Sequence, residues 1–332
     1  MNERNQYTEI RTQEKNICSM KSKLLQTKRG VPQGSILGPI LFIIYINDIT
    51  NNIPTNKLTV YADDTTLLNY KATNEELEID SFILLNSTAQ YYHEIGLKIN
   101  ESKTEYICFK TNYKISTDNY KPSLYLENTF LQEVTHTKFL GVTIDNFLNW
   151  NEHINNLSTK LSSSLYIIKS ISKLGCKKLS IQCYYSYFYS QVIYSIVLWG
   201  SSSAQNLQKI FLLQKRAIRY IENITKKDSC RELFIKNQIM TVPSLYMYET
   251  ILYVVENNLV NQIPVHNYFT RNKKQANQIH NMKIFEKTPT YMGRKFFNKL
   301  PKILQESSSD KINFKTLLKS WLISECFYKL DI

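Results

Sequence analysis

Paired cysteines are missing from this sequence. Its six cysteines are scattered along 332 residues, and none of them forms a Cys-x-x-Cys pair. This spacing argues against a zinc site and indicates reduced thiols in an intracellular protein. The first residues are polar and charged, which predicts that no secretory signal is present. Internal repeats and low-complexity tails are absent as well.

Long apolar runs without charge are rare, and one of them raises the question of a membrane span. Residues 179–199 contain no charged side chain, but they include Gln182, Gln191, several serines and five tyrosines. A helix that crosses a bilayer needs about 20 predominantly apolar residues. A buried, tyrosine-rich helix is therefore the favoured interpretation, and a membrane span is the alternative.

Negative charge is also scarce. The chain has 28 acidic residues against 41 basic ones, which gives a formal net charge of +13. Residues 1–112 carry 12 basic and 13 acidic side chains, whereas residues 113–332 carry 29 and 15. A basic half beside a half with carboxylates indicates a protein that binds phosphates in one part and metal in the other. A generally basic surface is the alternative.

One short stretch, Tyr61-Ala62-Asp63-Asp64, lies between two runs of apolar, strand-forming residues. Two adjacent acids in such a place predict the tip of a β-hairpin, where the chain turns and the carboxylates are exposed. Two-metal phosphoryl transfer needs such a pair, because protein carboxylates hold two Mg²⁺ ions roughly 3.5–4 Å apart. An isolated Asp-Asp pair is more often a plain polar turn, so this interpretation depends on other motifs.

A second motif, Gly30-Val31-Pro32-Gln33-Gly34, lies upstream. Its proline fixes one φ angle, and its glycines allow close approach to the backbone. Ser35 suits a helix N-cap, and the apolar residues that follow recur at i, i+3, i+4 and i+7. The run over residues 36–46 is too short to span a bilayer, so the sequence predicts a buried helix there.

Together these motifs resemble the reverse transcriptase domain of non-long-terminal-repeat (LINE-like) retrotransposons, and the jockey-type elements of animals in particular. Residues 29–39 and 61–64 are similar to the family's fourth and fifth motifs, in the family's order and at its distance. Two further matches follow at residues 100–104 and 138–145. Four motifs in order make the resemblance specific.

The resemblance implies an α+β fold and RNA-directed DNA synthesis. Residues 1–148 would form a partial polymerase palm, with an antiparallel sheet and helices, 149–256 a helical thumb, and 257–332 a helical C-terminal extension. The implied partners are an RNA template, a DNA primer and deoxynucleoside triphosphates, with Mg²⁺ as the cofactor. The primer 3′-hydroxyl attacks the α-phosphate and pyrophosphate leaves. Such a protein is expected in the cytoplasm or the nucleus, without a membrane partner.

The resemblance also implies roles for individual residues. Asp63 and Asp64 would be the catalytic metal ligands, with Asp64 the weaker of the two. Tyr61 would shape the primer side, and Lys103 would lie near the nucleotide's phosphates, although a solvent-exposed turn lysine fits its spacing equally well. Template and nucleotide would be placed by Gly30, Pro32, Gln33 and Gly34. The primer end would be gripped by Phe139, Leu140 and Gly141.

From Trp150 onward the apolar period changes from 2 to 3.6 residues, which predicts helices over residues 150–175, 179–199 and 207–221. The third helix has one apolar face and one basic face, on which Lys215, Arg216 and Arg219 lie near one another. Such a face suits phosphate binding, and an ordinary solvated face is the alternative. The resemblance extends through this region and weakens after residue 256.

The family's first catalytic aspartate ends an earlier strand, upstream of the motifs that match here. Asp48 and Glu101 lie in elements that cannot replace it. Three interpretations therefore stay open: a polymerase domain, active or not, a non-catalytic nucleic-acid-binding remnant, and an enzyme of the intron-maturase or telomerase lineage. The tyrosine-rich helices and the Ser-Cys-Arg sequence at residues 229–231 argue against the third.

Overall fold

A computed structural model describes residues 5–12, 18–26, 30–31, 34–109, 120–225, 228–260 and 284–330. The chain divides into two compact units. The first unit comprises Met1–Tyr106 and Thr117–Glu133, and the second comprises Ile107–Ser116 and Val134–Ile332. Helices and small antiparallel sheets occur together, which agrees with the predicted α+β class. The domain boundaries expected at residues 148 and 256 stay predictions.

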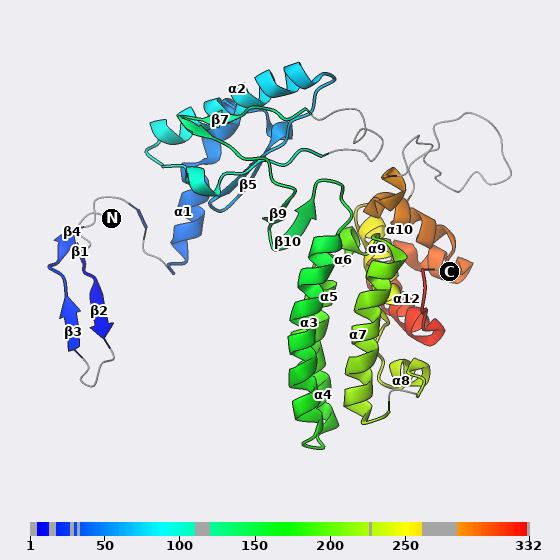
Figure 1. The fold of residues 1–332 in the computed structure, drawn as a ribbon. Coiled ribbons are helices and arrows are strands. Elements are labelled where there is room, and N and C mark those ends of the chain that lie inside the picture. The colour runs from blue at the N-terminus through cyan, green and yellow to red at the C-terminus, as the bar shows by residue number, and fades with distance from the viewer. Residues whose placement is uncertain are drawn as a thin grey trace, which may run out of the picture. The chain divides into compact units, whose positions relative to one another are not determined.

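The first unit begins with two short antiparallel ladders (Figure 1). Strand β1 (Asn5–Gln6) pairs with β4 (Leu25–Gln26), and β2 (Glu9–Thr12) pairs with β3 (Cys18–Lys21).

Helix α1 (Leu37–Tyr45) follows, and it is exposed rather than buried. Ser35 Oγ accepts a hydrogen bond from the Gly38 amide at 3.1 Å, which is the cap contact predicted for it. Within α1 only Gly38 is buried, while Ile44 is 65% exposed and Ile36, just before it, 90%. The predicted burial is therefore wrong. A helix that is apolar on all sides is buried only where neighbouring elements cover all of its sides. Helix α1 packs on the rest of the first unit through one end alone, near Phe42 and Ile46.

Helix α2 (Asn74–Glu94) packs on the hairpin formed by strands β5 (Leu58–Tyr61) and β6 (Asp64–Leu67). Thr73 is the N-cap of this helix, because its side chain accepts a hydrogen bond from the Glu76 amide. Its Leu84, Tyr91 and Tyr92 form a small core with the residues that follow α1. The other face of α2 packs on the pair β7 (Tyr125–Leu126) and β8 (Thr129–Phe130) through a separate apolar cluster.

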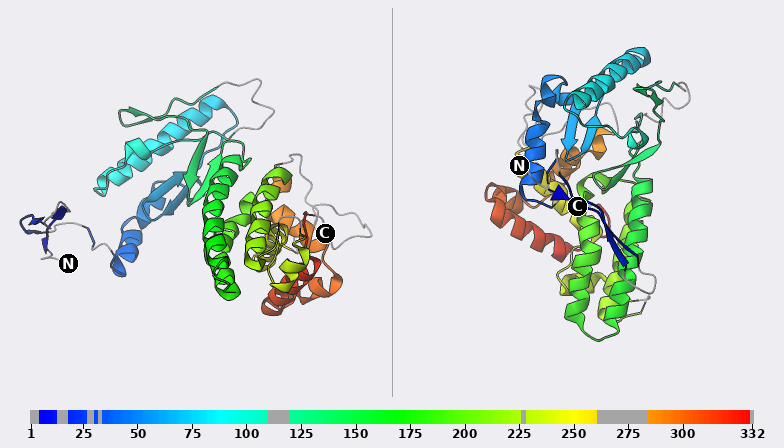
Figure 2. Two further views of the ribbon diagram at one scale, coloured as in Figure 1. Left: turned by 60° about the horizontal axis from the view of Figure 1, so that its bottom comes forward. Right: turned by 90° about the vertical axis from the view of Figure 1, so that its left-hand side faces the viewer.

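The second unit begins with the hairpin of β9 (His136–Phe139) and β10 (Val142–Asp145), and continues as helices. Helices α3 (Asn151–Ser172) and α7 (Ala204–Glu222) lie side by side (Figure 2). The others are α4 (Lys177–Cys183), α5 (Ser190–Ile193), α6 (Ile196–Trp199), α8 (Arg231–Lys236), α9 (Val242–Glu256), α10 (Pro289–Asn298), α11 (Lys302–Glu306) and α12 (Lys311–Glu325).

The charge-free run 179–199 does not form the single helix that its sequence predicts. A π-helical segment, Tyr184–Tyr189, separates α4 from α5. Ser195, with a φ of 55°, interrupts the helical structure a second time. Tyr184 and Phe188 are fully buried, whereas Tyr187 is exposed. Among the helices that the structure describes, none has both the length and the apolar character that crossing a membrane requires.

One apolar core holds the second unit together, and it includes side chains from Val142 to Cys326. Helices α10 and α12 both pack on the buried helix α9, so described residues beyond 256 share this core with those before it. The side-chain amide of Gln214 is buried in this core and hydrogen-bonded there. Gln214 donates hydrogen bonds to the Tyr184 hydroxyl and the Met240 carbonyl, and accepts one from the Val242 amide.

Close packing around Gly200 predicts a large effect for a single methyl group. A Cβ atom at Gly200 would lie 2.2 Å from Cδ2 of Tyr246 and 2.6 Å from the Ile196 carbonyl oxygen. We expect Gly200→Ala to lower the free energy of unfolding by about 1–3 kcal/mol, because the packed core must shift. Urea denaturation, followed by the fluorescence of the second unit's tryptophans, measures this loss.

Gly175→Ala is the matched control, because a Cβ there meets no atom within 4 Å and the cost comes from a φ of +74° alone. Its loss should be the smaller one, about 1 kcal/mol. Equal losses for the two variants would contradict the packing described for Gly200.

Candidate active site

The two adjacent acids lie at the tip of the β5–β6 hairpin, as the sequence predicts. Tyr61 pairs with Asp64 across the ladder, so Ala62 and Asp63 form a two-residue turn. Ala62 has a φ of 51°, a backbone region that favours glycine and occurs in the turns of tight hairpins. All four residues of the motif are exposed. Both carboxylates are therefore open to ligands in solution.

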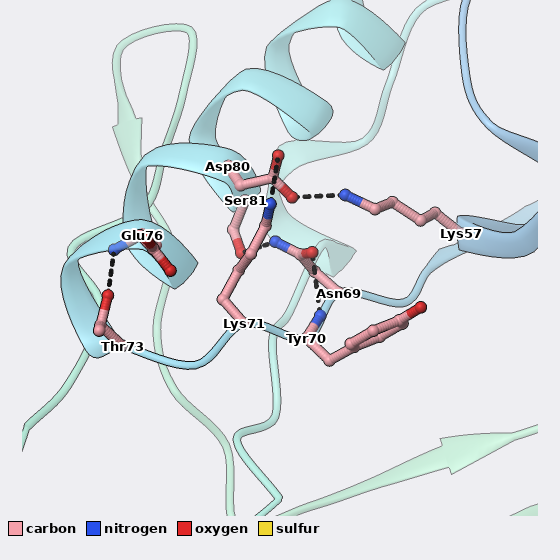
Figure 3. Close-up of polar contacts among 8 residues, drawn as sticks. All are labelled: Lys57, Asn69, Tyr70, Lys71, Thr73, Glu76, Asp80 and Ser81. Atoms are coloured by element: carbon pink, nitrogen blue, oxygen red, sulfur yellow. Dashed lines mark hydrogen bonds and ion pairs between the residues drawn. The ribbon is translucent and has the colours of Figure 1, made fainter.

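The base of this hairpin is tied to helix α2 by polar contacts (Figure 3). Lys57, just before β5, forms an ion pair with Asp80 on α2, and Lys71 lies 3.7 Å from the other oxygen of that carboxylate. Asn69, just after β6, donates a hydrogen bond to Ser81 at 2.9 Å. The Leu68 amide donates to the Lys57 carbonyl and extends the ladder. We call Lys57, Asn69, Lys71, Asp80 and Ser81 the base clamp.

The base clamp lowers the pKa of its carboxylate group, that of Asp80. The hydrogen bond from Lys57 and the charges of Lys57 and Lys71 outweigh partial burial, so the pKa of Asp80 lies below its ordinary value. Asp80 therefore remains ionised across the neutral range and keeps both lysines in place. The sequence did not single out this cluster, because its members are far apart along the chain and none belongs to a motif.

The other residues of the first unit with expected roles lie in several elements. Tyr61 is 63% exposed beside the turn, and Lys103 is exposed in the short 3₁₀ helix Glu101–Lys103. Gly30 and Gly34 have φ values of 85° and 78°. Pro32 and Gln33 lie outside the described residues.

Asp48 and Glu101, which the sequence excludes from completing a metal site, each accept a hydrogen bond from another side chain. Tyr91 donates a hydrogen bond to Asp48 at 2.6 Å, and burial together with this contact raises the pKa of Tyr91. Thr129 donates to Glu101. Within the described ranges, no group of three or more His, Cys, Asp or Glu side chains is placed to hold a metal ion. Asp63 and Asp64 are thus a pair of candidate ligands.

In the second unit, Phe139, Leu140 and Gly141 lie at the tip of the β9–β10 hairpin. The Thr143 amide donates a hydrogen bond to Nδ1 of the buried His153 on α3 at 3.4 Å. The Asp145 carboxylate accepts hydrogen bonds from three backbone amides between residues 147 and 150, which joins the hairpin to α3. The family resemblance implied a primer-end role for Phe139, Leu140 and Gly141, but it did not identify these anchors.

The three basic residues of α7 differ in their surroundings. Lys215 Nζ lies 4.3 Å from the ring centre of Phe211 and 4.5 Å from that of Tyr328, and burial lowers the pKa of Lys215. Arg219 donates a hydrogen bond to the Asp228 carbonyl at 3.2 Å. Arg216 is exposed. They therefore do not form one uniformly solvent-facing row, and their role in nucleic-acid binding remains a prediction.

The base clamp predicts that Asp80→Asn loosens the acidic hairpin. The substitution keeps the shape of the side chain but removes the charge that attracts both lysines. We expect amide hydrogen exchange in β5 and β6 to become several-fold faster. Glu127→Gln removes another exposed carboxylate of the first unit and should leave these rates unchanged. Unaltered exchange in Asp80→Asn would contradict the clamp.

His153 predicts a pH dependence of stability. Burial and the charge of Lys160 lower its pKa, so folding favours the neutral ring. The stability that His153 contributes is therefore present above the unfolded-state pKa of about 6.5 and is lost as the pH falls through the lower folded-state pKa.

In this window wild-type protein should lose up to about 1.4 kcal/mol per pH unit more than His153→Gln, which cannot titrate. Urea unfolding at a series of pH values measures the difference. His136→Gln, on exposed β9, should retain the wild-type pH dependence. Parallel curves for wild type and His153→Gln would contradict this account.

Comparison with known proteins places these features in a family. Residues 3–144 match the family model for reverse transcriptase (RNA-dependent DNA polymerase). This segment contains the acidic hairpin, the base clamp and most of the β9–β10 hairpin. No solved structure matches the chain at a significant level.

Several curated relatives are polymerases of mobile elements. The RNA-directed DNA polymerase from mobile element jockey of Drosophila melanogaster is 26% identical over 65% of this chain and 24% of its own length. The probable RNA-directed DNA polymerase from transposon X-element of the same organism is 26% identical over 58% of this chain and 21% of its own. The retrovirus-related Pol polyprotein from type-1 retrotransposable element R1 2 of Nasonia vitripennis is 25% identical over 43% of this chain and 35% of its own length.

The chain spans about a quarter of the length of the first two of these relatives. Residues 3–144 are therefore similar to the reverse transcriptase (RNA-dependent DNA polymerase) family, and the chain is similar to RNA-directed DNA polymerases of mobile elements.

Proposed function

We propose that this chain carries the metal-binding hairpin and the primer-binding part of an RNA-directed DNA polymerase. The observation that carries the proposal is the β5–β6 tip, where two exposed carboxylates lie on a two-residue turn inside the segment that matches the reverse transcriptase family. An exposed acidic tip on a clamped base suits a site that must admit a nucleotide and a primer end.

Asp63 and Asp64 fit Mg²⁺ by their chemistry, because this ion prefers carboxylate oxygens and is bound through one or two of them together with substrate phosphates. When bound, Mg²⁺ would lower the pKa of the primer 3′-hydroxyl and neutralise charge that develops on the phosphate. Asp63 and Asp64 would hold the ion, and the base clamp would keep the hairpin from shifting.

The substrates follow from the same proposal. An RNA template and a deoxynucleoside triphosphate would contact Gly30, Pro32, Gln33 and Gly34, with Lys103 near the triphosphate and Tyr61 on the primer side. The tip Phe139, Leu140 and Gly141 would contact the end of the DNA primer. The helices of the second unit would act as a thumb, with Arg216, Lys215 and Arg219 near the nucleic-acid backbone. The polymerase would work in the cytoplasm or the nucleus.

Two neighbouring carboxylates on one turn cannot surround two metal ions by themselves. A polymerase site of this kind needs a carboxylate from a second segment of polypeptide. We therefore propose that residues 1–332 bind nucleic acid but extend a primer efficiently only when such a segment is supplied.

Primer extension tests this proposal. Residues 1–332 with Mg²⁺, an RNA template and a DNA primer should extend the primer at background rate. Fusion to the upstream part of a jockey-type polymerase domain should raise kcat well above background. Asp63→Ala in the fusion should return kcat to background, because the lost interaction acts mainly in the transition state.

Glu127→Ala in the same fusion is the control and should keep full activity. Extension that survives Asp63→Ala would contradict the assignment of the acidic hairpin. A fusion that binds hybrid tightly but never extends it would instead favour a non-catalytic nucleic-acid-binding remnant.

A further inference from the structure

We propose that Tyr194 is a positioning residue for the primer end, because it fixes the backbone of the turn Leu140-Gly141. The inference rests on the proposed function, in which this turn contacts the primer. It concerns the second unit alone, since the hairpin β9–β10 and Tyr194 both belong to that unit. Neither the four sequence motifs nor the helical periodicity pointed to Tyr194.

The turn that Tyr194 contacts has an unfavourable backbone. Phe139 pairs with Val142, so Leu140 and Gly141 form a two-residue connection. Their φ values are 44° and 84°, which is the pattern of a type I′ turn with both central residues at positive φ. Glycine accepts this conformation, but a leucine in it is strained. Such strain persists only where surrounding contacts hold the backbone.

Tyr194 supplies such a contact through its hydroxyl group. The Tyr194 hydroxyl donates a hydrogen bond to the carbonyl oxygen of Leu140, which is the strained residue. The bond joins residues that are 54 positions apart. It fixes the orientation of the peptide group between Leu140 and Gly141, and therefore the direction in which the turn presents its backbone.

The ring of Tyr194 acts on the second residue of the turn. A Cβ atom at Gly141 would lie 3.3 Å from Cε1 of Tyr194 and 3.4 Å from its hydroxyl oxygen. The position therefore requires glycine for two reasons, its positive φ and the nearby ring. Gly141 is exposed, so its bare backbone can approach a sugar–phosphate group closely.

Tyr194 itself is anchored from the core. Its carbonyl oxygen accepts a hydrogen bond from Nε1 of the fully buried Trp199 at 3.0 Å. The next residue, Ser195, has a φ of 55° and turns the chain from α5 into α6. The side chain remains 52% exposed. A ring with a fixed backbone and an accessible edge is suited to hold one turn at the protein surface.

The test uses residues 1–332 and two RNA–DNA hybrids. One hybrid carries 2-aminopurine at the primer 3′ terminus, and the other carries it inside the duplex. Tyr194→Phe removes the hydroxyl and keeps the ring. Tyr187→Phe, which changes another exposed tyrosine of the same tyrosine-rich segment, is the matched control.

We expect Tyr194→Phe to leave the Kd for both hybrids unchanged, while the fluorescence response of the terminal probe falls to half or less. The internal probe should respond as in wild type. Hydrogen exchange at Phe139 and Val142, the pair that closes the turn, should become about fivefold faster, as expected for one lost hydrogen bond. Tyr187→Phe should alter none of these measurements.

The outcomes separate the two proposals. If the wild-type chain binds neither hybrid, the proposed function fails, and the primer-end role fails with it. If binding is normal and the terminal probe responds identically in Tyr194→Phe and wild type, the positioning role is overturned and the proposed function survives. If hydrogen exchange becomes faster but the terminal probe responds as in wild type, the positioning role is overturned as well, because Tyr194 would then stabilise the fold alone.

Discussion

The proposed metal site depends on one backbone constraint, the two-residue turn at Ala62 and Asp63. Side chains alternate between the faces of a strand. Two adjacent acids can therefore face the same ligand only where the chain turns. The pairing of Tyr61 with Asp64 places Asp63 in the turn and Asp64 at the first position of β6. The positive φ of Ala62 is the conformational cost of this arrangement.

That turn is exposed at its tip and held at its base. Isolated surface ion pairs contribute little to stability, but Asp80 contacts two lysines, and Asn69 bonds to the adjacent Ser81 on the same helix. The β9–β10 hairpin uses the opposite arrangement, because Tyr194 holds its tip directly. A metal-binding tip must leave its carboxylates uncovered. A turn that acts through its backbone can instead be held by the side chain of another residue.

The sequence predicted those features that depend on local pattern. Apolar, strand-forming runs located the acidic hairpin, and the change to a period of 3.6 residues located α3 and α7, because each pattern is local in the sequence. Contacts between distant residues leave no such pattern. Lys57 and Asp80 are 23 positions apart, and nothing in their local sequence shows that they meet.

Two further differences have specific causes. The run 179–199 contains residues that are all compatible with a helix, so its sequence did not reveal the break at Ser195. Helical spacing placed Lys215 on a basic face, but it could not show that the rings of Phe211 and Tyr328 lie within reach of the ammonium group.

The central claim is that Asp63 and Asp64 together bind a divalent ion at the hairpin tip. Mn²⁺ suits the same oxygen ligands as Mg²⁺, and it broadens the NMR signals of nearby amides because it is paramagnetic. Titration of the isotope-labelled chain with Mn²⁺ should broaden the amides of residues 61–65 first, and excess Mg²⁺ should reverse the effect. Asp63→Asn should abolish this broadening and leave the rest of the spectrum unchanged. Broadening that centres elsewhere, or that persists at the hairpin in Asp63→Asn, would contradict the account.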